Sequence, residues 1–172
     1  RIQYQISHAV PDNLHLTVTS YNRRVLLTGE VGTEQDKLKA QQVAQNSLEV
    51  SSVVNELLVA PVTSVTQRMS DSTLAGKVRT QLIGTSGVSL NQMKVTVDRG
   101  IVYLMGLVTQ QEAQKASEVA SRVSGVKSVV TAFEILSEQQ VQERLKLISN
   151  PEPASQGYTT TNNITNEYDS SA

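Results

Sequence analysis

The sequence contains no cysteine and no tryptophan, and aromatic residues make up only 3% of its 172 positions. Without cysteine, this chain cannot build disulfide scaffolds, iron–sulfur clusters or Cys-based zinc sites, and thiol catalysis is excluded. So few aromatic rings also argue against a platform that stacks nucleic-acid bases. The core must therefore consist mainly of aliphatic side chains.

Net charge and long apolar runs are also lacking. The 15 Lys and Arg nearly balance the 16 Asp and Glu, so the formal net charge is −1 and we expect no nucleic-acid partner. No run approaches the roughly 18 apolar residues that span a bilayer. Residues 1–6 lack a signal-peptide pattern, which favours a sequence that begins inside a domain.

An internal repeat is the strongest pattern in the sequence. Residues 16–31 align without a gap with residues 93–108 at an offset of 77, and residues 50–54 match residues 126–130 at an offset of 76. The chain therefore holds two copies of one small module. The positions of the first copy that recur as the same or a similar residue are Val18, Thr19, Val25, Leu27, Gly29 and Val31.

Each copy has the pattern of a β-hairpin and a later third strand. Alternating aliphatic residues flank turn residues at 20–23 and 98–100, and Asn22 is the expected left-handed residue of the first turn. The β-rich runs at 53–59 and 129–136 predict the third strands.

Helices are predicted between the hairpin and the third strand, and again before the second hairpin. Thr33 and Thr109, each with an acidic residue three positions later, open the helices that follow the hairpins. Gly125 is the expected C-cap of the later one. A further apolar stripe predicts a helix over residues 71–83. The narrow apolar face of the helix after Thr109 consists of Ala113, Ala116, Ala120 and Val123.

These elements predict an α+β fold of two tandem αββαβ modules, each a three-stranded mixed sheet packed against two helices. The first module retains only Ile2 and Ile6 of its opening helix, and Pro61 favours an extended linker. A capping box at residues 137–140 begins a C-terminal helix, which has three candidate partners: a module, another protein or the membrane. We expect the first module at residues 1–60, the linker at 61–70, the second module at 71–136, the C-terminal helix at 137–149 and a disordered tail at 150–172.

The segments VTSYNRRVLLTGEV (residues 18–31) and ASRVSGVKSVV (residues 120–130) strongly resemble BON domains, a small bacterial module named for phospholipid binding. The likeness covers residues 1–136, and the tandem arrangement resembles outer-membrane lipoproteins with two BON domains. It implies an upstream signal peptide and lipidated cysteine, and a location at the periplasmic face of the outer membrane. It also implies a non-enzymatic envelope-integrity factor that binds anionic phospholipids such as phosphatidylglycerol and cardiolipin and gathers at cell division sites.

The resemblance further implies that the opening helix of the second module contacts lipid. At 100° per residue, Ile83 falls off the apolar stripe of this helix, with Lys77 and Arg79 nearby. From the residues alone two interpretations stay open: the cations solvate an outer face, or an aliphatic anchor enters the headgroup zone while the cations meet phosphates. Some relatives carry tryptophan where this chain has Thr73. The implied lipid-binding residues are Thr73, Leu74, Lys77, Val78, Arg79 and Ile83.

Charge gives this interpretation modest support. Residues 70–136 contain seven Lys and Arg against five Asp and Glu, whereas residues 1–69 contain six of each. The second module is therefore the only positive segment, and each basic residue near an anionic surface contributes about 1 kcal/mol.

Catalytic and cofactor sites have no candidate residues. His8 and His15, near Asp12, are expected to be surface loop histidines and not metal ligands. Gly29 and Gly106 occupy matching strand positions, which a bulge or close packing explains better than cofactor binding. We therefore expect no enzyme activity, no cofactor and no metal. The alternative function is a soluble periplasmic stress or scaffold protein with chaperone-like binding of envelope proteins, and the presence of a lipidated cysteine upstream would discriminate the two.

Overall fold

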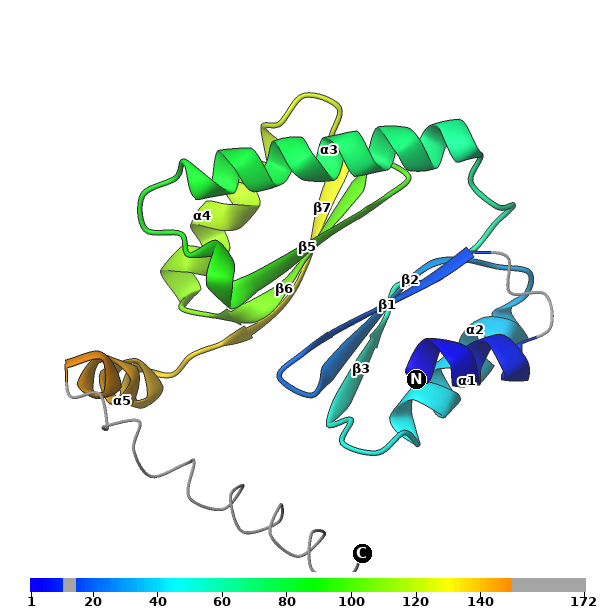
Figure 1. Ribbon diagram of the computed structural model, residues 1–172, viewed down its shortest axis with the longest axis horizontal. Coiled ribbons are helices and arrows are strands. Elements are labelled where there is room, and N and C mark those ends of the chain that lie inside the picture. The colour runs from blue at the N-terminus through cyan, green and yellow to red at the C-terminus, as the bar shows by residue number, and fades with distance from the viewer. Residues whose placement is uncertain (11–14, 150–172) are drawn as a thin grey trace, which may run out of the picture. The chain divides into compact units, whose positions relative to one another are not determined.

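The two copies of the repeat fold into the same order of helices and strands (Figure 1). The structure, a computed structural model, describes residues 1–10 and 15–149. The predicted α+β class and the two tandem αββαβ modules are confirmed. The first module consists of α1 (Ile2–Ala9), β1 (His15–Tyr21), β2 (Arg24–Val31), α2 (Glu34–Gln45), β3 (Ser52–Asn55) and β4 (Leu58–Val59). The second consists of α3 (Val65–Ile83), the 3-10 helix η1 (Leu90–Gln92), β5 (Met93–Asp98), β6 (Ile101–Val108), α4 (Gln110–Ser121) and β7 (Ser128–Ile135).

Each module has a mixed sheet in which the second strand of the hairpin is central. Strand β1 pairs antiparallel with β2, and β3 adds in parallel to the other side of β2. Strands β5, β6 and β7 repeat this order. The single strand predicted over residues 53–59 is instead two short strands along β2, interrupted at Glu56 and Leu57, and the Leu57 side chain is buried.

The hairpin turns follow the sequence prediction. Asn22 and Arg23 have φ angles of 49° and 65°, and Arg99 and Gly100 have φ angles of 54° and 75°. Two consecutive left-handed residues match the right-handed twist of the flanking strands, so these two-residue turns set the register of both hairpins.

The N-terminal caps of α2 and α4 are also confirmed. The Oγ1 atom of Thr33 accepts a hydrogen bond from the Asp36 N–H at 3.0 Å, and that of Thr109 accepts one from the Glu112 N–H at 3.1 Å. The predicted C-cap is wrong in position, because α4 ends four residues before Gly125, which has a φ of 99° in the turn that leads to β7.

Helix α3 begins earlier than predicted. It starts at Val65, so residues 65–70 of the expected extended linker are helical. The Ser64 side chain caps the helix by accepting a hydrogen bond from the Gln67 N–H at 3.0 Å. Gln67 in turn donates to the buried Asp71 at 3.0 Å, which secures the first turns against the poor helix propensity of their residues.

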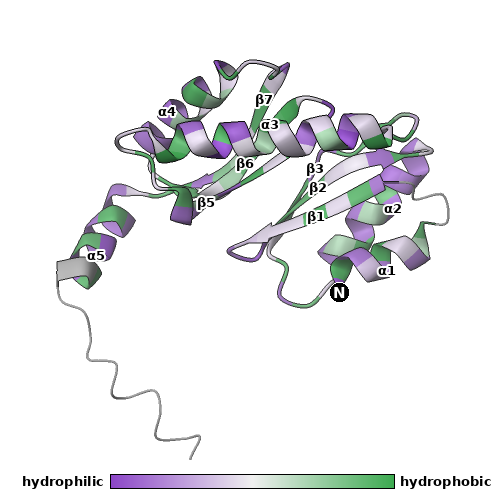
Figure 2. Cartoon of the chain, turned by 45° about the horizontal axis from the view of Figure 1, so that its top comes forward, coloured by the Kyte–Doolittle hydropathy of each residue, from purple (hydrophilic) through white to green (hydrophobic). Residues whose placement is uncertain are grey.

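The helices cover one face of each sheet, and the aliphatic core lies between these layers. Both helices and strands alternate between hydrophobic and hydrophilic residues, as elements with one buried face do (Figure 2). In the first module the core joins Ile6 of α1 and Ala40 of α2 to the sheet. In the second it joins Val78 of α3 and Ala116 of α4 to the sheet.

The opposite faces of the two sheets pack against each other through a third cluster. Leu26 of β2 contacts a group from the second module that includes Tyr103 and Met105. Leu26 and Tyr103 are equivalent residues of the repeat, and so are Thr19 and Thr96, whose Oγ1 atoms are 3.3 Å apart. Because equivalent residues meet, the two modules are related by a local pseudo-two-fold axis, like the subunits of a symmetric dimer.

The residues after Leu136 form a separate unit that contains α5 (Glu138–Ser149). Its predicted capping box is present: Ser137 Oγ accepts from the Gln140 N–H at 3.2 Å, and Gln140 Oε1 accepts from the Ser137 N–H at 2.9 Å. The tail over residues 150–172, predicted to be disordered, lies outside the described residues.

Candidate functional site

Helix α3 has one buried and one open side. Its buried side packs on the core of the second module, and its apolar members include Leu74 and Val78, two of the six implied lipid-binding residues. Their side chains are therefore not free to contact lipid, and this part of the predicted site is corrected to a supporting role. The buried residues are Asp71, Leu74, Ala75, Val78 and Leu82.

The open side of α3 is apolar at both ends and neutral between them. Val65, Met69 and Ile83 are 71%, 66% and 68% exposed. At 3.6 residues per turn, Val65 and Ile83 are five turns apart, so they point in the same direction about 27 Å from each other. We call this surface the outer face of α3; it consists of Val65, Met69, Ser72, Thr73, Gly76, Thr80 and Ile83, all of them exposed.

The charged residues of α3 flank this outer face. The helix has three cations, Arg68, Lys77 and Arg79, and one carboxylate, Asp71, which is buried. Lys77 is exposed and forms no ion pair with any residue that the structure describes. Arg79 is partly engaged, because its guanidinium donates to the Val95 carbonyl oxygen at 2.8 Å and so ties α3 to β5.

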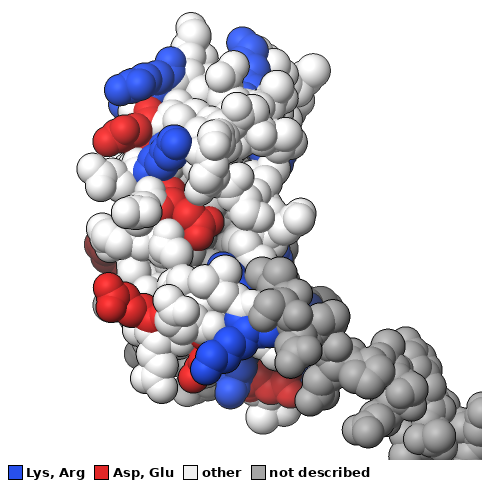
Figure 3. Space-filling model, turned by 90° about the vertical axis from the view of Figure 1, so that its left-hand side faces the viewer, with Lys and Arg blue, Asp and Glu red and all other residues white. Residues whose placement is uncertain are grey.

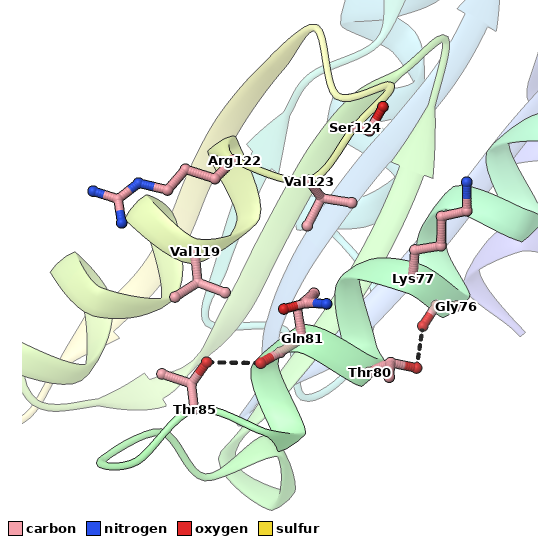
Figure 4. Close-up of a pocket in the computed structure, with 9 residues that line it drawn as sticks. All are labelled: Gly76, Lys77, Thr80, Gln81, Thr85, Val119, Arg122, Val123 and Ser124. Carbon is pink, nitrogen blue, oxygen red and sulfur yellow. Dashed lines mark hydrogen bonds between the residues drawn. The ribbon is translucent and has the colours of Figure 1, made fainter.

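A groove lies between α3 and α4 beside the outer face, with a volume of about 750 Å³ (Figure 4). Val119 and Val123 lie between two cations, Lys77 of α3 and Arg122 at the end of α4, which extend from opposite sides of the groove. Thr80 donates to the Gly76 carbonyl oxygen at 2.9 Å, so its hydroxyl is turned back to the helix. The groove therefore offers an apolar wall between two positive rims.

The side of the molecule seen in Figure 3 has no large patch of positive or of negative charge. Its Lys and Arg side chains are interspersed with Asp and Glu among many uncharged residues. The positive charge of α3 is therefore local. It depends on a few cations and on the absence of an exposed carboxylate from this helix.

Of the implied site residues, Thr73, Lys77 and Ile83 lie on the surface as the lipid interpretation requires. Val65 and Met69 were missed from the sequence, because the helix was predicted to begin at residue 71. The capping residue Ser64 and the five-turn spacing to Ile83 were the signals that would have found them. Arg122 and the groove were missed because they depend on how α4 packs beside α3.

A group of buried and partly buried titratable side chains lies where the sheets of the two modules meet. His15 Nδ1 is 2.7 Å from Glu30 Oε2 and 3.6 Å from Asp98 Oδ1. We call His15, Glu30 and Asp98 the interface cluster. Arg99 Nε donates to the other Glu30 oxygen at 3.0 Å. The Asp71 carboxylate accepts from the Arg99 and Gly100 N–H groups at 2.9 and 3.0 Å and so holds the nearby turn.

The pKa values of the two carboxylates of the cluster are shifted in opposite directions. Burial, and next the charge of Glu30, raises the pKa of Asp98 to about 6. Burial also opposes ionisation of Glu30, but hydrogen bonds, first from His15 and then from Arg99, outweigh this penalty and hold its pKa below the usual value. Glu30 is thus the satisfied carboxylate of the pair and Asp98 the unsatisfied one.

Neither histidine lies in the loop where the sequence analysis expected it, although His8 is on the surface as expected. His15 belongs to β1 and is only partly exposed, so its expected place in a surface loop is wrong. His8 is exposed in α1, where its ring contacts Tyr4. Asp12, the carboxylate considered beside them, lies outside the described residues.

Comparison with known proteins identifies the family. The family model described as BON domain matches residues 1–61 and again residues 70–137. The chain belongs to the BON domain family. It has two BON domains, as the motifs around the hairpins predict, and α3 is the opening helix of the second one.

Curated relatives support this membership. This dual BON protein is 34% identical over 141 residues to Outer membrane lipoprotein DolP of Haemophilus influenzae, with 78% of this chain and 73% of that protein covered. It is 29% identical over 132 residues to the 21 kDa hemolysin of Actinobacillus pleuropneumoniae, with 76% of this chain and 68% of that protein covered. It is 28% identical over 127 residues to Osmotically-inducible protein Y of Escherichia coli, with 72% of this chain and 63% of that protein covered. Within the described residues, no helix has the length and apolar character to cross a bilayer.

Proposed function

We propose that this dual BON protein binds anionic phospholipid, such as phosphatidylglycerol or cardiolipin, through the outer face of α3, and that it acts at the periplasmic face of the outer membrane. The observation that carries the proposal is the alignment of Val65, Met69 and Ile83 on one exposed side of a helix without an exposed carboxylate. The proposed role of the protein is non-enzymatic and supports outer-membrane integrity.

Adsorption needs an apolar contribution. Transfer of a fully exposed Val, Met or Ile side chain into an apolar medium stabilises by about 1.5–3 kcal/mol. The outer face presents three such side chains along about 27 Å of helix, with only small or hydroxyl residues between them. A helix of this kind lies flat in the interface and inserts shallowly.

The cations add selectivity for negative charge. Lys77 and Arg122 rim the groove between α3 and α4, and each contributes about 1 kcal/mol near an anionic surface. A lipid phosphate bound between these rims would bring its glycerol backbone next to Val119 and Val123. We therefore expect binding to weaken as salt is added, since exposed charges are screened within about 10 Å at 0.1 M ionic strength.

The relatives support the proposed location at the outer membrane. DolP of Haemophilus influenzae is named an outer membrane lipoprotein, and this chain matches 73% of its length. A tether to the same membrane would hold α3 near its lipid and raise the effective concentration, so that a weak peripheral contact suffices.

The first prediction concerns binding to phosphatidylglycerol vesicles. Met69→Asp combined with Ile83→Asp is expected to reduce co-sedimentation at least about 10-fold, because two inserted side chains are replaced by carboxylates that repel the lipid. Lys77→Glu combined with Arg122→Glu is expected to reduce it by a similar factor and to remove its salt dependence. Far-UV circular dichroism checks that each variant folds.

Matched controls come from α2 of the first module. Leu38 is an exposed hydrophobic residue and Lys39 an exposed cation. Leu38→Asp and Lys39→Glu are expected to leave vesicle binding unchanged. If the α3 variants bind like the control variants, α3 is not the lipid surface. If no variant and no wild-type protein binds vesicles, the alternative of a periplasmic scaffold that binds envelope proteins takes its place.

A further inference from the structure

The interface cluster contains a buried carboxylate that lacks the partners such a group needs. Asp98 is only 3% exposed, and its Oδ2 atom has no hydrogen-bond partner among the described residues. An ionised carboxylate is strongly destabilising in a protein interior unless it is paired or coordinates a metal. A cation bound beside the Asp98 carboxylate would therefore offset the cost of burying its negative charge.

A second atom without a hydrogen-bond partner belongs to Thr28, which lines the same pocket as His15 and Asp98. Thr28 is 1% exposed, and its Oγ1 atom also has no hydrogen-bond partner in the part of the chain that the structure describes. Thr28, His15 and Asp98 line one pocket of about 410 Å³ at the module interface. The pocket therefore borders two of the three residues of the cluster, His15 and Asp98.

The repeat shows that sheet packing does not require these charges. The offset of 77 residues makes Leu107 the counterpart of Glu30, and Tyr21 the counterpart of Asp98. On the other side of the pseudo-two-fold axis the same positions are therefore uncharged. The carboxylates occur on one side of the interface only. Packing of the sheets does not explain them, which favours a binding function.

We propose that His15 Nδ1, Glu30 Oε2 and the carboxylate of Asp98 bind a divalent transition-metal ion of the zinc class at the interface of the two BON domains. Each of the three residues offers a ligand atom, and these atoms all lie within 4.8 Å of one another. Tetrahedral Zn²⁺ with bonds of about 2.0–2.2 Å separates its ligands by about 3.3 Å. The two separations from His15 Nδ1, 2.7 Å to Glu30 and 3.6 Å to Asp98, bracket this value, so small side-chain movements complete the site.

The hydrogen bonds around Glu30 leave the required oxygen available. Its Oε1 atom accepts from Arg99 Nε at 3.0 Å and from the Thr63 N–H at 3.2 Å, while Oε2 faces His15. The guanidinium of Arg99 thereby orients the carboxylate that binds the ion. The positive charge of Arg99 also repels the ion, as do the charges of Arg68 and Arg79, which line the adjoining pocket. We therefore expect the ion to bind reversibly.

The ligand set favours one class of ion. Imidazole nitrogen suits Zn²⁺ and its neighbours in the transition series, whereas Mg²⁺ and Ca²⁺ prefer sites built from oxygen alone. A water molecule would fill the fourth position. Since His15 and Glu30 belong to the first module and Asp98 to the second, the bound ion would link the two modules and stabilise their packing.

The test is a zinc titration of the full chain, prepared with chelator and then freed of it. Isothermal calorimetry is expected to show one equivalent of Zn²⁺ bound, and saturating Zn²⁺ is expected to raise the melting temperature by about 5 °C or more. Mg²⁺ at the same concentration is expected to raise it by much less. The chain has only two histidines, so the imidazole NMR signals report directly on the site, and the His15 ring is expected to shift while the His8 ring does not.

The variants are chosen to keep the fold. His15→Gln retains a group that hydrogen-bonds Glu30, and His8→Gln is the matched control on α1. His15→Gln and Asp98→Asn are each expected to weaken Zn²⁺ binding at least about 10-fold, with His8→Gln unchanged. Equal Zn²⁺ affinity in wild type and His15→Gln, a shift of the His8 ring alone, or equal stabilisation by Mg²⁺ would each overturn the proposal. Lipid binding is measured separately, and its presence or absence does not bear on this result.

Discussion

Replacing Gly29 by valine is expected to destabilise the first module by roughly 3–5 kcal/mol. Gly29 has a φ of 116°, and a Cβ atom at this position would lie 2.1 Å from the carbonyl oxygen of His15 on the paired strand. The left-handed strain costs about 1–3 kcal/mol, and the forced separation of β1 from β2 loses ladder hydrogen bonds worth about 1 kcal/mol each. Chemical denaturation followed by circular dichroism measures the loss.

Two comparisons test the reason for this loss. Gly106 is the equivalent residue of the second module, and its Cβ would lie 2.2 Å from the Gln92 carbonyl oxygen, so Gly106→Val is expected to be as damaging. A Cβ at Gly76 in α3 would meet no atom within 4 Å, so Gly76→Ala is expected to be neutral or to stabilise by up to about 1 kcal/mol. Tolerance of valine at Gly29 would mean that β1 does not approach β2 as closely as described.

The second large effect is the pH dependence of stability that comes from Asp98. Its pKa of about 6 lies above the ordinary value of 3.8, so the folded state holds this proton more tightly than the unfolded state. The resulting stability is fully present below about pH 4 and is lost as the pH rises through 6. With chelator present, Asp98→Asn is therefore expected to be more stable than wild type at pH 7 by about 2–3 kcal/mol, and to lack this loss.

Urea denaturation at a series of pH values between 4 and 7.5 measures this difference. Glu30 acts in the opposite direction, because its pKa is lowered and its contribution is lost at low pH, but it is present in both proteins. Glu118→Gln, at an exposed carboxylate of α4, is the control and is expected to change stability little at any of these pH values. A wild-type protein as stable at pH 7 as the Asp98→Asn variant would show that Asp98 has a partner in solution.

Helix α3 connects the two proposals. Its outer face carries the proposed lipid-binding residues, while Asp71 on its buried side holds the turn that follows Asp98 and contains Arg99. The interface between the modules and the proposed membrane surface therefore both depend on correct folding of α3. Asp71 is the one carboxylate of α3, whose other charged residues are cations.

Much of the fold was predictable from patterns of neighbouring residues. The duplicated hairpins follow from alternating aliphatic residues around turns such as Asn22 and Arg23, and the helix starts follow from Thr33 and Thr109. In each case the deciding interactions join residues within three or four positions of each other. The same patterns carry the BON resemblance, which the family comparison confirms.

The candidate site was predicted less well, because burial of a helix face depends on its partners. Ile83 was expected on the surface and is, but Leu74 and Val78 are core residues and Arg79 is tied to β5. The first turn and a half of α3 was missed because local propensity is weak there. Its stability comes from Gln67 and Asp71, and Asp71 is held in place by a turn 28 residues away.

Short-range chemistry in the chain was thus enough to establish the repeat, the α+β class, the hairpins and the caps, since each arises between residues that are close in sequence. The packing of α3 on its own module decided which side of this helix is open, and only the packing of the two sheets brought His15 and Glu30 to Asp98. No pattern in the sequence brings those three together, because their contact depends on where two separately folded layers touch. The proposed ion site is for this reason a property of the assembled pair of modules and of neither one alone.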